Sequence, residues 1–502
     1  MQKYYFFMPF VIRKAILLMA ITAVSFYCKG QSYIGYHSSA YTGVYSILNN
    51  PADILNHRVR GDLNLVGLST GIGNNIITFK YSNRKDDNGG FSFPNPITKT
   101  GKFNFNTDVF GPSILIRLSD KNAIAVTTRA RVATNVYGLG TPMLNGLLQD
   151  TIASELINHV LNIHDMNANV HAWKEVALTY SRQIANSDYG VWKIGASLKY
   201  LGGIAALSIN TKNLQYTYDS IIDPADNKKK DALVNTQGSF ALDYTKTFDS
   251  ISGNDFISFK HPGIGLDIGV NYEYRDEMQV YETVYSDRTA NYIWKVGASI
   301  TDIGFIKYNK QDMKSIAAKF SGYSYFIDQL NVPSDSSDAS QMANYYKNLF
   351  NARTEASKIT MQLPTTLHLT YDRYFNKWLG VQALVNVPLV FSKLSYYVGN
   401  YAPISVYVTP RAEISWVGLY FPIGYNSISG MQAGAAMRLG PLVIGSSSII
   451  NTRMLGKTRS VDAYFILRLP LFGYRPFKNK NNGQEQPKLT KRQKRMLDCP
   501  GK

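Results

Sequence analysis

Apolar and polar residues alternate without interruption between His261 and Arg275. The apolar positions share one face of an extended chain: Ile264, Leu266, Ile268, Val270, Tyr272 and Tyr274. The opposite face carries Gly263, Gly265, Asp267, Gly269, Asn271 and Glu273. Side chains of a strand point alternately to its two faces, and a tilted strand of about 9–11 residues can cross a bilayer. The segment therefore predicts one strand of a membrane β-barrel, with its apolar face toward lipid.

The same alternation recurs along most of the chain. In the first segment, Leu63, Leu65, Gly67 and Ser69 are predicted on one face, and the last segment ends on Phe472, as terminal strands of exported barrels tend to. The predicted strands cover residues 59–82, 103–118, 123–136, 176–183, 191–201, 261–275, 291–308, 364–375, 378–390, 404–410, 414–422, 431–439, 442–449 and 460–472.

Short turns and long loops alternate between these strands. The short turns are 120–122, 186–188, 375–377 and 440–441, whereas the long connections are 83–101, 138–171, 202–260 and 309–361. An even strand number with short turns at one rim is typical of single-chain outer-membrane barrels. The sequence predicts an all-β fold, a transmembrane antiparallel β-barrel of about 14 strands with an N-terminal hatch and helical inserts in the long extracellular loops.

Three segments of the long loops show helical character. Leu144, Leu147, Leu148, Ile152, Leu156 and Val160 recur at helical spacing within 138–171, and this predicts an amphipathic helix. Packing onto the loop or the barrel rim is favoured over partner binding. Further helices are expected near 313–320 and 342–350.

The first 30 residues resemble an export signal. Lys3, Arg13 and Lys14 precede an apolar run that ends at Phe26 and is too short to span as a helix. Cleavage is expected after Gly30; in the alternative of a lipoprotein, Cys28 would carry the lipid. Removing the signal takes away four of the 53 Lys and Arg residues, which lowers the formal net charge from +18 to +14.

A polar and aromatic segment at 31–58 lacks strand alternation and carries the motif Asn49, Asn50, Pro51 and Ala52. We expect it to form a hatch inside the barrel, with a disordered leader as the alternative. The expected organisation is a signal peptide at 1–30, the hatch at 31–58, the barrel at 59–473 and a basic periplasmic tail at 474–502. Two strands also resemble each other: Trp192 to Leu198 closely matches Trp294 to Ile300. The match suggests a repeated hairpin unit, and common strand chemistry is the alternative.

Several short motifs point to a family. The leader with Asn50-Pro51-Ala52, a turn at Pro410 to Glu413 and a turn at Arg438 to Leu442 resemble an uncharacterised outer-membrane barrel family of Bacteroidetes-type bacteria. That family is distantly similar to the FadL/PorV type, barrels of 14 strands with an N-terminal hatch. The resemblance implies a barrel, a hatch and an outer-membrane location. It implies function only loosely, because such barrels include transporters of hydrophobic solutes and subunits of secretion machinery.

Candidate chemistry is sparse, and no enzyme activity or cofactor is predicted. Gly67 to Gly71 fits the G-x-S-x-G pattern, but that motif needs a strand-to-helix elbow and in this chain lies within a predicted strand. The seven histidines show no metal-ligand spacing. The acidic stretch from Asp223 to Asp231 contains three lysines, which favours a solvated loop over a calcium site.

Charged residues of both signs are predicted on the lumen face of the strands. They are expected to pair with each other and with the hatch, and a role in solute selectivity is the alternative. The set comprises Arg129, Arg131, Lys193, Lys199, Asp267, Glu273, Lys295, Asp372, Asp462 and Arg468.

The tail beyond 474 is strongly basic and contains Lys491, Arg492, Lys494, Arg495 and the last cysteine, Cys499. A periplasmic basic segment could contact peptidoglycan, anionic lipid or a partner protein; a solvated, disordered tail is the alternative. Two functions remain open: an accessory subunit that works with other envelope proteins, or a transporter of hydrophobic small molecules. The expected partners are outer-membrane lipid, envelope proteins and a hydrophobic ligand; nucleic acid is excluded by the expected location.

Overall fold

The structure is a computed structural model of the chain. It describes residues 33–55, 59–80, 90–92, 100–119, 121–140, 160–163, 165–187, 189–248, 255, 258–275, 292–330, 339–355, 358–376, 378–389, 398–399 and 402–473. The predicted signal peptide, the basic tail with Lys491, Arg492, Lys494, Arg495 and Cys499, and most of the helix expected within 138–171 lie outside these residues.

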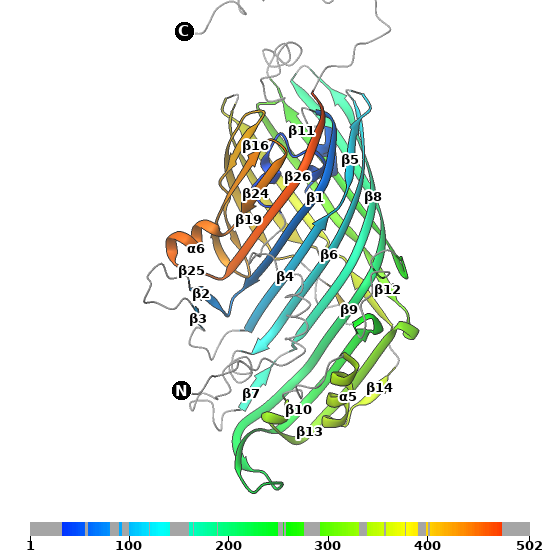
Figure 1. Cartoon of the computed structure of the whole chain (residues 1–502), viewed down its shortest axis with the longest axis vertical. Helices are drawn as coiled ribbons and strands as arrows, with labels where there is room; N and C mark the ends of the chain where they lie inside the picture. Colours follow the sequence, from blue (N-terminus) through cyan, green and yellow to red (C-terminus); the bar gives the residue numbers. More distant parts are fainter. Residues whose placement is uncertain are drawn as a thin grey trace, which may run out of the picture.

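The described strands form a closed antiparallel β-barrel of 14 strands, as the sequence predicts. The ends of the sheet meet where β1 pairs with β26, from Val59 opposite Gly473 to Gly73 opposite Ser460 (Figure 1). Four strands of the wall are interrupted by one to three residues, and each of these four consists of two consecutive segments. In chain order the strands are β1 (Val59–Asn74), β4 (Thr100–Phe110) with β5 (Ser113–Arg117), β6 (Asn122–Gly140), β8 (Asn167–Asn186), β9 (Gly190–Ile222), β11 (His261–Tyr274), β12 (Trp294–Tyr308), β15 (Ile359–Gln362) with β16 (Thr366–Tyr374), β17 (Leu379–Pro388), β19 (Ser405–Glu413), β20 (Val417–Tyr420) with β21 (Ile423–Asn426), β22 (Gly430–Ala433) with β23 (Ala435–Leu439), β24 (Leu442–Ser446) and β26 (Ser460–Gly473).

The outer surface of the barrel is apolar, as the alternation in β11 predicts. Ile264, Leu266 and Ile268 are 66%, 38% and 43% exposed, whereas Asp267 between them is buried. Aromatic rings gather where β9, β11 and β12 approach the rim with the short turns: Tyr272 lies 4.9 Å from Trp192 and 5.5 Å from Trp294 between ring centroids. Tyr and Trp are enriched at membrane–water interfaces, so this cluster is consistent with one edge of the membrane.

The predicted face of β1 is wrong in part. Leu63 and Leu65 point away from the lumen, but Ser69 is buried inside. The cause is a β-bulge between Asn64 and Val66, where the register with β26 shifts by one residue. A bulge inserts an extra residue into one strand, and the period of two means that the faces are exchanged beyond it.

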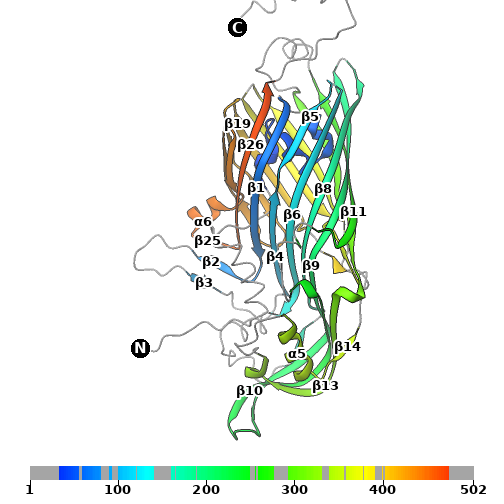
Figure 2. The same ribbon diagram turned by 45° about the vertical axis from the view of Figure 1, so that its right-hand side comes forward.

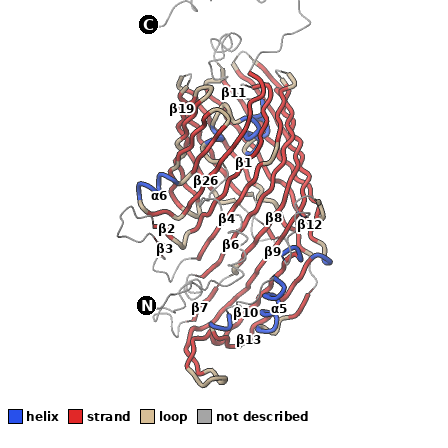
Figure 3. Tube along the Cα trace, in the orientation of Figure 1, coloured by secondary structure: helices blue, strands red, loops and turns tan. Residues whose placement is uncertain are grey.

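The hatch lies inside the barrel near the rim with the short turns (Figures 1 and 3). It consists of short 3-10 helices: η1 (Tyr36–Ser38), η2 (Gly43–Leu48) and η3 (Pro51–Leu55). Gly43 has a φ of +59°, and a side chain there would overlap the Asp62 carboxylate of the barrel wall. Glycine therefore allows both the turn and the close approach at this position.

A second body of sheet extends beyond the barrel on the side of the long loops (Figures 1 and 2). β9 is 33 residues long; its first part pairs with β11, and its last part leaves the barrel wall and pairs with β10 (Lys229–Thr245). β10 in turn pairs with β13 (Met313–Phe326). β7 (Val160–Ile163), β14 (Arg353–Glu355), η5 (Lys246–Phe248), η6 (Lys310–Asp312), η7 (Asp328–Leu330) and the helix α5 (Ala339–Leu349) complete this extension.

The helix expected near 342–350 is confirmed as α5, but the helix expected near 313–320 is wrong. Residues 313–320 belong to β13 because they pair with β10 along their whole length, and tertiary pairing overrides weak local preference. The loop expected at 138–171 is too long, because residues 138–140 belong to β6, 160–163 to β7 and 167–171 to β8. Of the residues expected to form its helix, only Val160 lies in the described part of the chain, and it belongs to β7.

The extension has its own apolar core. Leu242, Tyr244, Ile316 and Ala318 pack against Ala343 of α5. The β9–β10 hairpin is closed at its tip by an ion pair of 2.6 Å from Lys230 Nζ to Asp223, and the hydrogen bond from Lys230 holds the pKa of the Asp223 carboxyl below its usual range. The extension is thus a folded body.

The remaining elements lie at the same end of the barrel. β18 (Val398–Gly399) pairs with β15. A separate small sheet contains β2 (Thr78–Lys80), β3 (Gly90–Ser92) and β25 (Lys457–Thr458), and α6 (Ile449–Leu455) precedes β25. Within the described part of the chain, none of the helices has the length and apolar character that a membrane crossing requires.

A charge placed on the outer surface tests the membrane-facing assignment. We expect Ile268→Lys to destabilise the barrel by about 2–4 kcal/mol, and Tyr274→Lys near the rim to cost about 0–1 kcal/mol, because a lysine on the lipid face is most costly at mid-membrane depth. Equilibrium unfolding in phospholipid vesicles measures both. Equal effects of the two substitutions would contradict the assignment.

Candidate functional site

The hatch motif is held by the inner surface of β11. Asn50 Nδ2 donates to Asn271 Oδ1 at 2.8 Å and to the Val270 carbonyl at 3.2 Å. Asn50 Oδ1 accepts from the Ala52 amide at 2.9 Å, which fixes the turn before η3. The motif Asn49, Asn50, Pro51 and Ala52 therefore attaches the hatch to the wall through an asparagine pair.

Glycines on three adjacent strands create the space for this motif. Gly195 of β9 lies opposite Gly269 of β11 in the sheet. An added Cβ at Gly195 would come within 2.5 Å of the Pro51 and Ala52 backbone, and one at Gly269 would overlap the Asn50 side chain. A Cβ added at Gly297 of β12 would lie 3.1 Å from Asn50 Nδ2. Glycine permits such close approach of backbone to backbone.

Two of the glycines that make room for the hatch motif, here called the glycine seat, belong to the sequence repeat. Gly195 and Gly297 are equivalent positions of the two matching heptapeptides, as are Lys193 and Lys295. Lys295 Nζ pairs with Asp53 of the hatch at 2.6 Å, whereas Lys193 Nζ pairs with Glu273 at 2.6 Å. The repeat thus supplies the small residues and the cations on either side of β11.

Other hatch contacts involve the opposite side of the barrel. Glu413 accepts hydrogen bonds from Ser39 Oγ at 2.7 Å and from the Ala40 amide at 3.1 Å. Asp62 accepts from the Val44 amide at 2.8 Å and pairs with Arg468 at 3.3 Å. Because wall strands on both sides of the lumen bond to it, the hatch is attached around the lumen.

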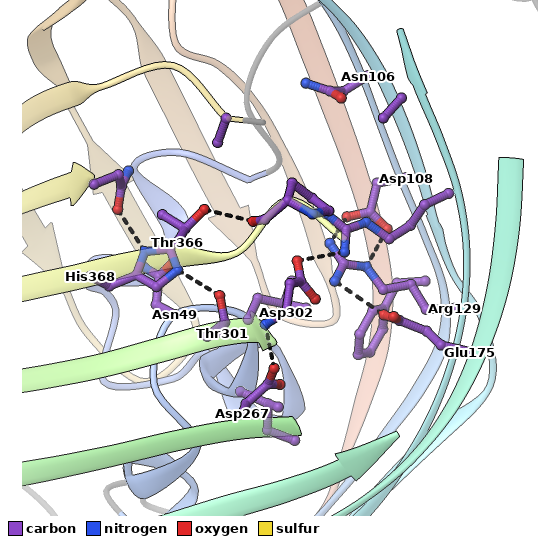
Figure 4. A pocket seen from close by; sticks show the side chains of 18 of the residues that line it. Asn49, Asn106, Asp108, Arg129, Glu175, Asp267, Thr301, Asp302, Thr366 and His368 are labelled. Carbon is purple, nitrogen blue, oxygen red and sulfur yellow. Dashed lines mark hydrogen bonds and ion pairs between the residues drawn. The ribbon is translucent and has the colours of Figure 1, made fainter. Parts of the chain in front are cut away.

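A cavity lies on the long-loop side of the hatch (Figure 4). Its empty volume is about 1130 Å³, part of it open to solvent. The hatch contributes Ile34, Ile47 and Leu48, which give part of the lining an apolar character. The strand residues are mostly charged or polar: Asn106, Asp108, Arg129, Arg131, Glu175, Lys199, Asp267, Thr301, Asp302, Thr366, His368 and Asn386.

Most charged groups around the cavity are paired. Arg129 Nε donates to Asp108 at 2.8 Å, and its terminal nitrogen lies 3.3 Å from Glu175. Asp302 binds both Arg131 at 2.7 Å and Lys199 Nζ at 2.6 Å. Glu175 retains one buried carboxylate oxygen without a hydrogen-bond partner among the described residues. The geometry agrees with the expectation that charges of opposite sign pair in the lumen.

Asp302 occupies an unusual backbone position. Its φ is +59°, at a point where the register between β11 and β12 shifts. Its amide donates to Asp267 at 2.7 Å, and Lys199 lies 2.9 Å from the same Asp267 carboxylate. The irregularity therefore directs a second carboxylate toward Lys199 and Arg131, which balances two buried cations.

The predicted lumen residues fall into several groups. Arg129, Arg131, Lys199 and Asp267 line the cavity, and Lys295 binds the hatch. The others lie elsewhere in the lumen: Lys193 with Glu273, Asp372 with Arg411 at 2.7 Å, and Arg468 with Asp62. Asp462 instead accepts bonds from the hydroxyls of Ser446, Ser447 and Ser448.

Several partners of these residues were not predicted from the sequence. Asp108 follows the inward alternation of its predicted strand and could have been found, whereas Asp53 and Asp302 lie outside regular alternation. The partners that were missed are Asp53, Asp62, Asp108, Glu175, Asp302, Arg411 and Glu413.

The turn predicted at Pro410 to Glu413 is wrong, because these residues form the end of β19.

The two kinds of chemistry considered from the sequence, hydrolysis and metal binding, have no matching geometry among the described residues. Gly67 to Gly71 lies inside β1 and forms no strand-to-helix elbow. In the described part of the chain, no group of three or more His, Cys, Asp or Glu side chains could hold a metal ion. His368 is instead bonded to Thr301 at 2.8 Å and to Asn386 at 2.7 Å.

Comparison with known proteins identifies one family. The sequence matches the group described as "Family of unknown function (DUF5723)" over residues 51–447. A search of curated proteins finds no match.

Solved outer-membrane proteins show distant structural similarity. The Ralstonia pickettii toluene transporter TbuX is 10% identical, with 85% of this chain and 93% of that chain covered and a TM-score of 0.37. A Pseudomonas aeruginosa FadL homologue is 10% identical, with 84% and 91% covered and a TM-score of 0.36. The translocator domain of autotransporter NalP from Neisseria meningitidis is 8% identical, with 82% and 88% covered and a TM-score of 0.28. These values are too low to transfer an activity.

The glycine seat can be tested by adding one methyl group. We expect Gly195→Ala to displace the hatch at a cost of about 1–3 kcal/mol, because the new Cβ would overlap the Pro51–Ala52 backbone. Hydrogen–deuterium exchange should become faster in residues 43–55. Gly73→Ala is the matched control, since its Cβ would meet only Ser429, at 3.6 Å. If hydrogen–deuterium exchange in residues 43–55 is unchanged in Gly195→Ala, the hatch does not require a glycine at this position.

The Asp53–Lys295 pair gives a second test. Lys295→Met should lower the free energy of unfolding by up to about 3–5 kcal/mol, because it removes the cation from a carboxylate that is only 14% exposed. Adding Asp53→Asn to this variant should recover most of the loss. Urea unfolding of Lys295→Met, Asp53→Asn and the double variant measures the coupling; additive losses would mean that the two groups do not interact.

Proposed function

The chain belongs to this family of unknown function, and we propose that it is a non-enzymatic outer-membrane protein whose barrel anchors an extracellular sheet for contact with partner proteins. The apolar outer surface and the closed barrel support the outer-membrane location, as does the export signal that the sequence predicts at residues 1–30. A closed barrel is one of the two structures that satisfy all backbone groups in lipid.

The continuity of β9 is the observation that carries the proposal. One strand runs from the barrel wall into the extension without a break, so the extension is held at a fixed position relative to the barrel. Crossing the membrane does not require a sheet of this size, and the extension has an apolar core of its own. A folded body that projects from a membrane anchor suits protein binding.

The attachment of the hatch also favours an anchor. Asn50, Asp53 and Glu413 join the hatch to different parts of the wall through buried bonds. Releasing the hatch would expose several buried charges at once, each costly without its partner. A lumen filled in this way supports a structural role more than free diffusion of solutes.

Transport is the second candidate, favoured by the cavity beside the hatch. Ile34, Ile47 and Leu48 offer an apolar surface there, but the facing charges make the site mixed in character. A hydrophobic solute would leave Glu175 unsatisfied. Lipid or detergent density in an experimental structure of the cavity would favour transport.

Site-specific photo-cross-linking in cells tests the partner role. Tyr323 on β13 is 57% exposed, so a photoreactive residue there should form an adduct with a neighbouring protein. The same probe at Ile268 faces lipid and is the control. Replacing residues 218–233 by a short turn should leave barrel assembly intact, as judged by heat-dependent gel mobility, and abolish the co-purified partner.

The absence of an adduct at Tyr323, or retention of the partner by the shortened variant, would overturn the proposal. A parallel truncation after Gly473 separates the extension from the basic tail. Partner loss only in that truncation would assign the interaction to the periplasmic side instead.

A further inference from the structure

A small lobe projects sideways from the outside of the barrel. Figures 1 and 2 both show α6, β25 and β2 outside the wall. The lobe leaves the barrel where β1 and β26 end: the Asn74 amide donates to the Arg459 carbonyl at 3.0 Å, and the next residue, Ser460, pairs with Gly73. It is thus continuous with the outer surface of the barrel.

The path into the lobe is fixed by buried bonds. Asp462 accepts from the Ser447 amide at 2.6 Å and from Ser448 Oγ at 2.6 Å, directly before α6 begins. Asn451 Nδ2 of α6 donates to the Met431 carbonyl of β22 at 2.7 Å. The helix ends at Gly456, which has a φ of +64°. The lobe is therefore tied to the barrel at both ends.

One part of the lobe is apolar and exposed. Met454 is 78% exposed, Ile449 is 52% exposed, and the adjacent Met431 on the barrel wall is 66% exposed. On the neighbouring strands β24 and β26, Ile444 and Phe465 pair with each other and are also exposed, at 43% and 41%. Grouped exposed apolar residues mark an interaction surface, and this one continues the membrane-facing belt.

The other part of the lobe is basic. Lys80 of β2 and Lys457 of β25 are paired directly across the small sheet, and both side chains are exposed. Like charges in opposite positions of a sheet destabilise it. Neither lysine has an ion-pair partner within the described residues. An anion between the two ammonium groups would offset their repulsion.

We propose that this lobe binds the phosphate groups of outer-leaflet lipid. Apolar residues beside basic ones are typical of elements that lie in a membrane interface, and basic residues near a membrane surface attract anionic headgroups. The lipid is identified by continuity with the apolar belt and by charge complementarity. The inference rests on the outer-membrane location proposed above and is independent of the partner role of the extension.

Native mass spectrometry of the full chain in detergent tests the proposal, with lipid A as the probe. The protein should retain phosphorylated lipid A in preference to lipid A without phosphates. Lys80→Gln with Lys457→Gln should weaken that retention by roughly fivefold per lysine. The matched control is Lys228→Gln with Lys229→Gln, which removes the same charge from two exposed lysines at the start of β10 and in the turn before it.

Three results would overturn the inference: equal retention of both lipids, retention unchanged in the Lys80/Lys457 variant, or equal loss in the control variant. Displacement of the lipid by inorganic phosphate alone would show an adventitious anion site and would also overturn it. Loss of the cross-linked partner at Tyr323 in the Lys80/Lys457 variant, with lipid retention intact, would assign the lobe to protein binding. The measurement of lipid retention does not depend on whether the cross-linking experiment at Tyr323 succeeds.

Discussion

The pairing of β1 with β26 is the constraint on which the rest of the structure depends. Lipid offers no hydrogen bonds, so every backbone amide and carbonyl at membrane depth must be paired within the protein. The two strands meet this requirement across the full length from Val59 to Gly73. Closure also determines the two surfaces: alternate residues face lipid, and the others face a confined lumen that must be filled or hydrated.

Ion pairs and hydrogen bonds between buried polar side chains stabilise the lumen. Buried charges are costly unless paired, and the wall presents cations and carboxylates from strands far apart in the sequence, such as Arg131 with Asp302 and Arg411 with Asp372. The hatch completes this network through Asp53 and Glu413 contacts. Barrel and hatch therefore depend on each other, since neither satisfies its buried groups alone.

The departure of β9 from the barrel wall links the barrel to the extension. Near Gly203 the strand exchanges its neighbour β11 for β10, and the sheet continues beyond the membrane-facing surface. Because β9 is continuous, no flexible joint separates the extension from the barrel. The lateral lobe at α6 is attached in the same direct way, by Asp462 and Asn451. Both bodies are thus oriented by the barrel.

The sequence by itself determined the barrel, the approximate strand number, the lipid-facing residues and the hatch, because a period of two is a local property that any strand between lipid and lumen must show. It also marked the seat of the hatch through the repeated Gly195 and Gly297, although their purpose was not evident. Tertiary structure alone decided which charges meet, because partners such as Asp53 and Lys295 are distant in the chain. It also decided the bulge at Asn64 and the strand at Met313 to Phe326, since register and pairing with β10 come from neighbouring strands and not from local pattern.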